Sequence, residues 1–347
     1  MTTIPHSCPT IDRSDFLALE KPMASGQVSA GPCVKSFESA FAAKFDFKDA
    51  AAVSSGTAAL HLSLLALGVK KGDEVVLPSY VCPALLNAIS YTGAMPKVAD
   101  VDYEDGNISC VAAKAQLTRK TKAIIVPHMF GEPADLQPLL SLGVPVIEDC
   151  AQAIGARYRG KYVGSFGVLS VFSFYATKMM TTGEGGMVVS ADKRLMARVR
   201  DMLSYDHHPE FCVRFNNKMT DLQAALGCSQ LKKLDKMISL RRSLARLYSE
   251  RLKGLDMTFP FHSLLTTPVF YRYVVKISGR AQKVITGMKK RGINCERPLY
   301  KPVHQYLKLK GFPVTENLMK DSISLPIYPS LSFRDALRVV KEFYQQA

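Results

Sequence analysis

The stretch Val146–Val189, VIEDCAQAIGARYRGKYVGSFGVLSVFSFYATKMMTTGEGGMVV, decides the fold that we predict. Its first residues form an apolar run typical of a buried strand, and this run ends at Glu148-Asp149. In a parallel sheet the carboxyl ends of the strands form the ligand crevice, so an acid at this position is expected to face a ligand. A second strand, Leu169–Tyr175, leads to Lys178 and a glycine-rich turn, which puts this lysine on a loop.

An acid at the end of one strand and a lysine after another suggest pyridoxal phosphate chemistry. This cofactor needs a lysine amine to bind its aldehyde, and an acid on its ring nitrogen to keep the pyridinium protonated. Lys178 and Asp149 could fill these two roles. The alternative is that Lys178 is one of many surface charges, because the chain has 45 Lys and Arg residues, and only the surrounding pattern argues against this interpretation.

Four motifs of this stretch resemble, in order and spacing, the sugar aminotransferases of the DegT family, which belong to the aspartate aminotransferase superfamily (fold type I). They are Glu148-Asp-Cys-Ala-Gln152, Gly164-Ser-Phe-Gly167, Ser173-Phe-Tyr-Ala-Thr-Lys178 and Gly183-Glu-Gly-Gly186. The resemblance covers nearly the whole chain. It implies an α/β fold: a mostly parallel seven-stranded sheet in a three-layer sandwich, plus a smaller α+β C-terminal domain.

The division of the chain follows from its length and pattern. With 347 residues and 47% hydrophobic content, two domains are expected, a large cofactor-binding domain at residues 1–235 and a small domain at 236–347. Residues 1–30 are weakly patterned, whereas residues 31–45 have the apolar spacing of a helix. A long amphipathic helix is predicted from Asp221 to about Lys253, where it links the two domains.

The amino-acid composition limits the cellular locations and the ligands that we expect. No apolar run approaches the length of a membrane span, and the N-terminus lacks the apolar core of a signal peptide. Eight cysteines without a C-x-x-C pair argue against a disulfide scaffold or a zinc site. The adjacent His207 and His208 have no further ligands at useful spacing, so no metal is expected. We therefore expect a cytoplasmic protein.

The formal charge of +15 could favour an anionic ligand such as a nucleotide diphosphate, or a nucleic acid, or an acidic membrane surface. The basic residues are spread along the chain, however, which is typical of a solvated surface without a specific role. We see neither a basic recognition helix nor an aromatic-basic strand motif. The sequence therefore predicts no nucleic acid and no membrane partner.

A phosphate site is predicted at Ser55, Gly56 and Thr57, where a helix begins after a short strand. Free backbone N–H groups and the positive end of the helix dipole bind phosphate readily, although plain N-capping explains the same residues equally well. In the DegT family a Ser-Gly-Thr segment holds the cofactor phosphate. The resemblance thus favours a phosphate site here.

The resemblance implies further cofactor contacts. Gln152 matches the position that bonds the phenolic oxygen of the cofactor, and Ser173 matches a phosphate contact. Asn216 matches an asparagine that reaches across a dimer interface to the partner's cofactor phosphate, which implies a homodimer with shared active sites. Lys218 replaces the usual arginine of that motif, and this exchange is not neutral where a planar fork is used.

Cys82 is a second departure from the family, which usually has an aromatic residue stacked on the cofactor ring at this position. Either Tyr80 supplies the aromatic face from two residues away, or the ring is covered by a thiol, or Cys82 is an inert core residue. His128 lies in a segment that resembles the His-x-x-Gly turn of the family, and a place near the site and a structural role are equally open for it.

The substrate is indicated by residues 296–304, which resemble a motif that lines the substrate cleft of members acting on nucleotide-linked keto-sugars. Arg297, Tyr300 and His304 are the substrate-binding candidates. We therefore expect a pyridoxal-phosphate-dependent aminotransferase that moves an amino group, from glutamate, to a keto group of a nucleotide-activated sugar, for amino-sugar and surface polysaccharide biosynthesis. Lys178 would be the base and acid of the proton transfer.

Two alternatives remain open at this point. The acceptor could be a free keto-sugar or keto-cyclitol of secondary metabolism, and a requirement for the nucleotide would discriminate between the two kinds of acceptor. The departures at Cys82 and Lys218 would also suit a cofactor-binding regulator without catalytic activity.

Overall fold

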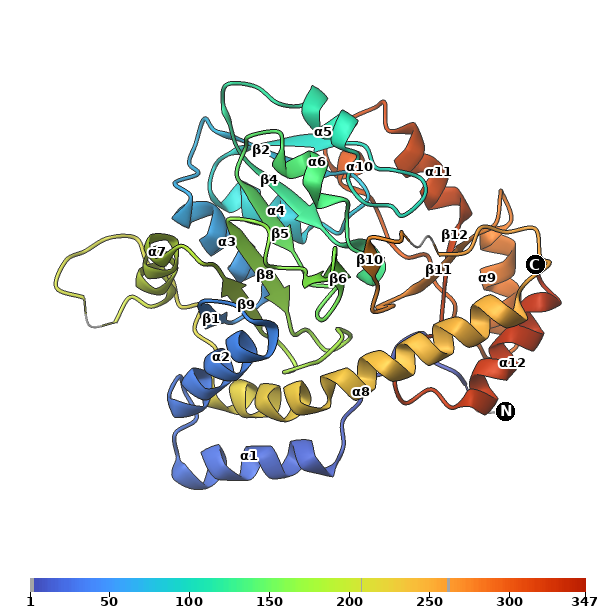
Figure 1. Ribbon diagram of the computed structural model, residues 1–347, viewed down its shortest axis with the longest axis horizontal. Helices are drawn as coiled ribbons and strands as arrows, with labels where there is room; N and C mark the ends of the chain where they lie inside the picture. The colour runs from blue at the N-terminus through green and yellow to red at the C-terminus, as the bar shows by residue number, and fades with distance from the viewer. Residues whose placement is uncertain (1–2, 207, 261–262) are drawn as a thin grey trace.

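The computed structural model describes residues 3–206, 208–260 and 263–347. Its centre is a seven-stranded sheet in the order β1-β9-β8-β5-β4-β2-β3 (Figure 1). The pairs β2–β3, β2–β4, β4–β5 and β5–β8 are parallel, whereas β9 is antiparallel to its neighbours β1 and β8. The predicted α/β fold with a mostly parallel seven-stranded sheet is confirmed. The strands of this sheet are β1 (Ala50–Val53), β2 (Glu74–Pro78), β3 (Met95–Ala99), β4 (Thr121–Pro127), β5 (Val146–Asp149), β8 (Leu169–Ser173) and β9 (Gly186–Val189).

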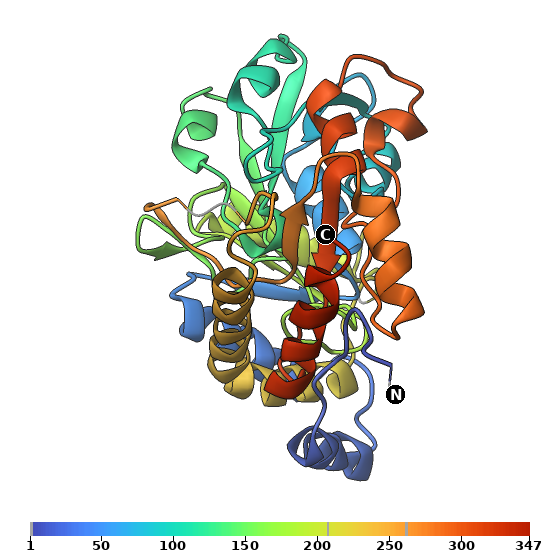
Figure 2. The same cartoon turned by 90° about the vertical axis from the view of Figure 1, so that its right-hand side faces the viewer.

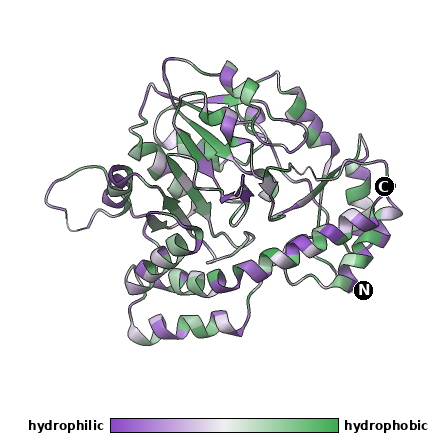
Figure 3. Cartoon of the chain, viewed as in Figure 1, coloured by the Kyte–Doolittle hydropathy of each residue, from purple (hydrophilic) through white to green (hydrophobic). Residues whose placement is uncertain are grey.

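Two apolar cores lie on the two faces of the sheet. Ala50 and Ala52 of β1 belong to the core that contains Phe37 and Phe41 of α2, and the intervening Ala51 belongs to the opposite core. This alternation follows from the period of two in a strand. Figure 3 shows the strands mainly in the hydrophobic colour, as expected for a sheet covered on both faces. The covering helices include α2 (Pro32–Phe45), α3 (Gly56–Ala66), α4 (Ala84–Tyr91) and α7 (Lys193–Leu203).

The long helix α8 (Asp221–Arg251) joins the sheet to the C-terminal part of the chain. It begins with a capping box in which Thr220 and Gln223 satisfy each other's backbone N–H groups. Its first half packs into the core of α2, and its last turns pack into a third core. Figure 2 shows α12 beside this end of α8. The third core also holds β11 (Tyr273–Lys276), β12 (Ser322–Leu325), α9 (Ala281–Lys290) and α12 (Phe333–Tyr344).

Helix α1 (Arg13–Ser25) is an element that the weak pattern of residues 1–30 did not predict. It packs on α8 chiefly through a polar network around the buried carboxylate of Asp15. Ser229, Gln230 and Lys233 of α8 donate to this carboxylate at 2.6–2.9 Å. The large apolar side chains Phe16, Leu17 and Met23 of α1 are exposed, so apolar periodicity does not mark the polar face that packs on α8.

The remaining elements are short. The strands β6 (Arg157–Tyr158), β7 (Lys161–Tyr162) and β10 (Thr266–Thr267) form a small antiparallel sheet. The helical segments are α5 (Cys110–Ala115), η1 (Met129–Gly131), α6 (Leu136–Leu140), α10 (Val303–Tyr306) and α11 (Pro313–Asp321). Across the described residues, no helix combines the length and the apolar character needed to cross a membrane.

Candidate active site

Asp149 is the last residue of β5, a central strand of the sheet. Its side chain is largely buried, and Oδ1 accepts a hydrogen bond from the backbone N–H of Ala151 at 3.0 Å. Burial raises the pKa of the Asp149 carboxyl, against the opposing effects of the Ala151 N–H and the positive charge of Lys178. A buried carboxylate in this situation gains from a cationic partner such as a protonated ring nitrogen.

The N-terminus of α3 lies beside the end of β8. Ser55 is the N-cap of α3 and accepts from the backbone N–H of Ala58 at 3.1 Å. Gly56 approaches Ser173 so closely that a Cβ at position 56 would lie 2.9 Å from the Ser173 Cβ. The absent side chain leaves the backbone N–H groups of the first turn accessible. This is the geometry that a phosphate group requires.

Lys178 lies on the loop that follows β8, as predicted. Its backbone N–H donates to the carbonyl of Tyr175 at 2.9 Å, which closes a turn. The Nζ atom lies 5.0 Å from the centroid of the Tyr271 ring. The Tyr271 hydroxyl forms a hydrogen bond of 3.3 Å with Oγ1 of Thr177, the residue before Lys178. The lysine loop therefore contacts a segment that is distant in sequence.

One cavity of about 260 Å³ connects these elements. Its wall contains every residue that the sequence predicted for the cofactor except Asn216, which lies in the exposed segment before α8. The predicted residues in the wall are Ser55, Gly56, Thr57, Cys82, Asp149, Gln152, Ser173 and Lys178. A carboxylate, a lysine and a helix N-terminus thus face one space, and this donor set fits pyridoxal phosphate.

Cys82 and Tyr80 differ in their relation to this cavity. Cys82 is exposed and lines the cavity. Tyr80 is completely buried and packs edge-on against Phe130 instead, with ring centroids 6.0 Å apart. Burial raises the pKa of the Tyr80 phenol to about 12. Of the two residues considered for the ring face, the thiol is the one in the wall.

Gln152 lines the cavity and also holds the neighbouring turn. Its Oε1 accepts from the backbone N–H of Phe130 at 2.9 Å. Phe130 has a positive φ of 60°, a conformation that is strained for a non-glycine residue. The Gln152 side chain therefore stabilises the turn that follows β4 while its amide faces the site.

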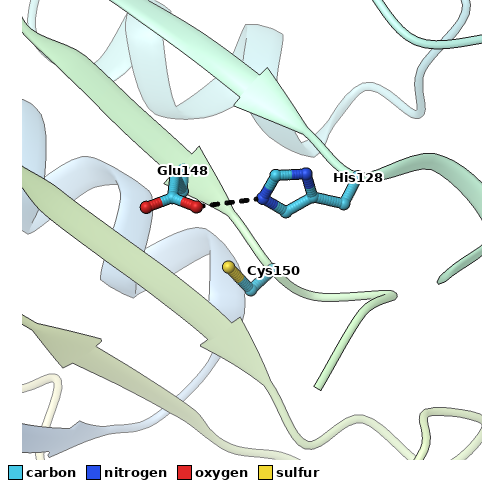
Figure 4. A group of neighbouring side chains, drawn as sticks. All are labelled: His128, Glu148 and Cys150. Atoms are coloured by element: carbon cyan, nitrogen blue, oxygen red, sulfur yellow. Dashed lines mark hydrogen bonds and ion pairs between the residues drawn. The ribbon is translucent and has the colours of Figure 1, made fainter. Parts of the chain in front are cut away.

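His128, Glu148 and Cys150 form a fully buried cluster behind Asp149 (Figure 4). Their ligand atoms lie within 4.8 Å of one another, the spacing of a metal site. The carboxylate of Glu148 is already occupied, since each oxygen accepts hydrogen bonds: from the backbone N–H groups of Phe166 and Gly167 on Oε1, and of Gly164 on Oε2.

His128 completes this network. Its Nδ1 accepts from the backbone N–H of Ala134 at 3.0 Å, so the proton is on Nε2, which lies 3.2 Å from Oε2 of Glu148. The hydrogen bonds thus assign His128 a structural role, and it is not part of the cavity wall. Of the two adjacent histidines, His207 lies outside the described residues, and His208 contacts Asp201.

The three substrate candidates lie apart from the cofactor cavity. Arg297 donates to the carbonyls of Met319 and Lys320 at the end of α11. His304 is buried and stacks on Phe312, with a hydrogen bond to Ser79 Oγ, and burial lowers its pKa. Tyr300 is 92% exposed. None of these described side chains lines the cavity that holds Lys178.

A second cleft of about 330 Å³ adjoins the lysine loop, and most of its residues were not predicted from the sequence. Thr177, next to Lys178, lies in its wall. The polar residues of the wall come from four separate segments, and they are His6, Ser7, Thr177, Tyr271, Arg272, Asn294 and Glu296. Of these positions only Glu296 lies in the predicted substrate motif at residues 296–304, and no local motif marks the others.

His6 contacts the charged residues Glu296 and Arg272 of this cleft. Its Nδ1 lies 3.3 Å from a Glu296 carboxylate oxygen, and its Nε2 forms a hydrogen bond of 2.8 Å with Ser324. Burial and the nearby Arg272 lower the pKa of His6 to about 3, so the imidazole is neutral. The cleft thus offers a guanidinium, a carboxylate, an amide and hydroxyl groups beside the lysine loop, a set suited to a polar ligand rich in hydroxyls.

Residues 9–344 match the model of the DegT/DnrJ/EryC1/StrS aminotransferase family. The chain belongs to this family. It is 37% identical over 342 residues to the GDP-perosamine synthase of Escherichia coli O157:H7, with 91% of each chain covered. It is 33% identical to the spore coat polysaccharide biosynthesis protein SpsC of Bacillus subtilis, with 97% of this chain and 95% of that protein covered.

Solved structures of DegT-family proteins have the same fold. The S. venezuelae protein DesV superposes with a TM-score of 0.94 and 30% identity, covering 99% of this chain and 98% of that chain. The aminotransferase TlmJ from Streptoalloteichus hindustanus gives a TM-score of 0.94 and 31% identity over the same shares. The predictions of an aminotransferase and of pyridoxal phosphate as its cofactor are confirmed by this membership.

Proposed function

We propose that this aminotransferase transfers an amino group from glutamate to the keto group of a nucleotide-linked sugar, in the synthesis of amino sugars for surface polysaccharides. The observation that carries the proposal is the single cavity that unites Lys178, Asp149 and the N-terminus of α3. The sugar assignment is supported by the relatives, among which GDP-perosamine synthases recur. A GDP-linked keto-sugar is therefore the first acceptor to test.

Each residue of the cavity would have a separate role in cofactor binding or proton transfer. Asp149 holds the protonated ring nitrogen, while Ser55, Gly56, Thr57 and Ser173 hold the phosphate. When bound, the cofactor supplies an electron sink for the carbon that loses or gains a proton. Lys178 would accept that proton and return it, because its side chain lines the cavity that would hold the cofactor.

Cys82 and Gln152 complete the cofactor site in this proposal. The Cys82 thiol would cover one face of the ring, in place of an aromatic side chain, and the Gln152 amide would donate to the phenolic oxygen. Both positions are supported by the wall of the cavity. A thiol is small and polarizable, so it leaves more room over the ring than a Phe or Tyr side chain would.

We assign the sugar to the second cleft, because Thr177 brings its wall next to Lys178. Arg272, Asn294 and Glu296 provide a donor, an amide and an acceptor for sugar hydroxyls. Tyr300 is exposed and remains a candidate for the outer part of the substrate. Arg297 and His304 make their hydrogen bonds within the chain, so they would act on the substrate only through the segments that they hold.

We propose a homodimer in which Asn216 reaches the phosphate in the partner's cavity. The segment between α7 and α8 projects from the body of the protein (Figure 1) and presents apolar side chains, with Phe211 97% exposed. Contiguous apolar exposure of this kind marks an interaction surface.

We also propose a cytoplasmic location and a division into domains at residues 1–235 and 236–347.

Absorbance spectroscopy of the purified protein with its cofactor tests the proposal. Glutamate should shift the visible band to the near ultraviolet, and a GDP-linked keto-sugar should restore it, whereas the keto-sugar without nucleotide should not. Lys178→Ala should abolish both changes, and normal turnover by that variant would refute the mechanism. A band that ignores glutamate would refute the donor, and equal use of the free sugar would favour the alternative acceptor.

A further inference from the structure

Tyr271 is the aromatic side chain that faces Lys178 from the C-terminal part of the chain. The lysine Nζ lies over its ring, 5.0 Å from the centroid, and its hydroxyl bonds Thr177 Oγ1. Tyr271 also lines the second cleft, so it contacts both the lysine loop and the space assigned to the sugar. No motif in the sequence marks this residue.

The backbone of Tyr271 is held from two sides. Arg241 of α8 is fully buried and donates from Nη1 to the carbonyl of Tyr271 at 3.1 Å and to that of Ile327 at 2.8 Å. On the other side, Gly131 approaches the backbone so closely that a Cβ there would lie 2.8 Å from the Tyr271 nitrogen. Tyr271 is therefore fixed in place before any ligand binds.

The charges around the phenol are predominantly positive. Lys178 faces the ring from the lysine loop, Arg241 lies behind it, and the Arg272 guanidinium lies 5.5 Å from the ring centroid. His6 and Glu296 lie in the wall of the same cleft. Burial alone would raise the pKa of Tyr271, but Lys178, Arg272 and the hydrogen bond with Thr177 outweigh burial and lower this pKa to about 8.

We propose that Tyr271 is a positioning residue for proton transfer: its ring face holds the protonated amine of Lys178, and its hydroxyl fixes the lysine loop through Thr177. A lysine that carries a proton between two carbon atoms must be charged for part of each turnover. An aromatic face within about 6 Å stabilises an ammonium group, most strongly where water is excluded. The inference rests on the assignment of Lys178 as the catalytic lysine.

Two substitutions separate the ring from the hydroxyl. Tyr271→Leu removes the aromatic ring face that contacts Lys178. We expect the first-order rate of amino transfer from glutamate to fall about tenfold to thirtyfold. The half-saturating glutamate concentration should change less than about threefold. Tyr271→Phe keeps the aromatic ring and removes only the hydroxyl, so we expect the rate to fall less than about fivefold. The pH–rate profile should lose its inflection near pH 8, because the phenol is gone.

Tyr273→Phe is the matched control. Tyr273 is also a buried phenol, two residues away, but its hydroxyl bonds Ser249 in the third core and burial raises its pKa to about 12. This variant should keep the rate and the inflection of the wild type. Cofactor content and thermal unfolding of each variant would show that the loss of rate in Tyr271→Leu does not come from misfolding.

A titration of the cofactor-free protein provides a readout that needs no activity. Tyrosinate absorbance of the wild type minus that of Tyr271→Phe should show one phenol that ionises near pH 8, and the corresponding difference for Tyr273→Phe should show none below pH 10. The proposal is overturned if Tyr271→Leu reacts at the wild-type rate, or if the Tyr271 phenol titrates at or above the ordinary pKa of 10.0, because the charge of Lys178 would then not reach it. If the wild type itself ignores glutamate, the proposed donor is wrong, and the titration still decides the role of Tyr271.

Discussion

Glu148→Gln is the substitution whose cost the structure defines most closely. Glu148 lies directly before Asp149, and its carboxylate is fully buried. Oε1 accepts from two backbone N–H groups, while Oε2 accepts from the Gly164 N–H at 2.8 Å and from His128 Nε2 at 3.2 Å. An amide has the same size and shape, so the substitution changes the hydrogen bonds and leaves the packing almost unchanged.

The loss of stability in Glu148→Gln follows from the number of hydrogen-bond donors that are left without an acceptor. If the amide oxygen takes the place of Oε1, the new NH₂ group faces the N–H groups of Gly164 and His128. His128 cannot move its proton, because Nδ1 already accepts from the Ala134 N–H. Each buried donor without an acceptor costs about 1–3 kcal/mol, so we expect a loss of about 2–6 kcal/mol in the free energy of unfolding.

Thermal unfolding of the cofactor-free protein measures this effect, with the exposed Glu20→Gln on α1 as the control. The midpoint should fall by at least about 3 °C for Glu148→Gln and stay unchanged for the control. The cofactor should also bind more weakly to Glu148→Gln, because Asp149 loses its support. A midpoint within 1 °C of the wild type, at about neutral pH, would refute the reasoning.

Lowering the pH should also remove the stabilisation that the Glu148 carboxylate provides. Burial opposes ionisation of Glu148, but hydrogen bonds from His128, Gly164 and Gly167 lower its pKa below the ordinary 4.5. The folded protein then binds a proton here less readily than the unfolded chain. The contribution to stability is present above pH 4.5 and is lost as the pH falls through the lower value in the folded protein. The wild type should therefore lose more stability below pH 4.5 than Glu148→Gln does.

Further predictions concern the phosphate site, the substrate candidates and metals. Gly56→Ala should weaken cofactor binding at least about tenfold in a titration of the cofactor-free protein, since its methyl group would lie 2.9 Å from the Ser173 Cβ; affinity within twofold of the wild type would contradict this. His304→Ala should lower the free energy of unfolding by about 1–3 kcal/mol in denaturant unfolding, whereas the exposed Tyr300→Ala should change it by less than about 0.5 kcal/mol; equal effects would contradict the burial argument. Dialysis against a chelator should leave activity unchanged, because backbone N–H groups occupy the Glu148 carboxylate; a loss that added metal restores would show that the cluster binds metal.

The positions where local backbone pattern and chemistry coincide could be predicted from the amino-acid sequence alone. A strand that ends in an acid, a helix that begins at Ser55, and a lysine after the next strand are each fixed by residues near one another in the chain. Strand ends and helix starts depend on short-range signals, so Asp149, Ser55 and Lys178 could be assigned to one edge of a parallel sheet. The helix α1 escaped prediction because a buried polar network holds the face that packs on α8, and apolar periodicity does not mark such a face.

The side chains that face the site from distant parts of the chain could not be predicted in this way, because their positions depend on how the folded chain packs. Thr177 and Tyr271 are 94 residues apart, and His6 reaches the same cleft from the N-terminus. The choice between Cys82 and Tyr80 likewise depended on which side chain the core could bury. Such contacts depend on how α8 and the third core pack against the sheet, and long-range packing has no periodicity along the sequence.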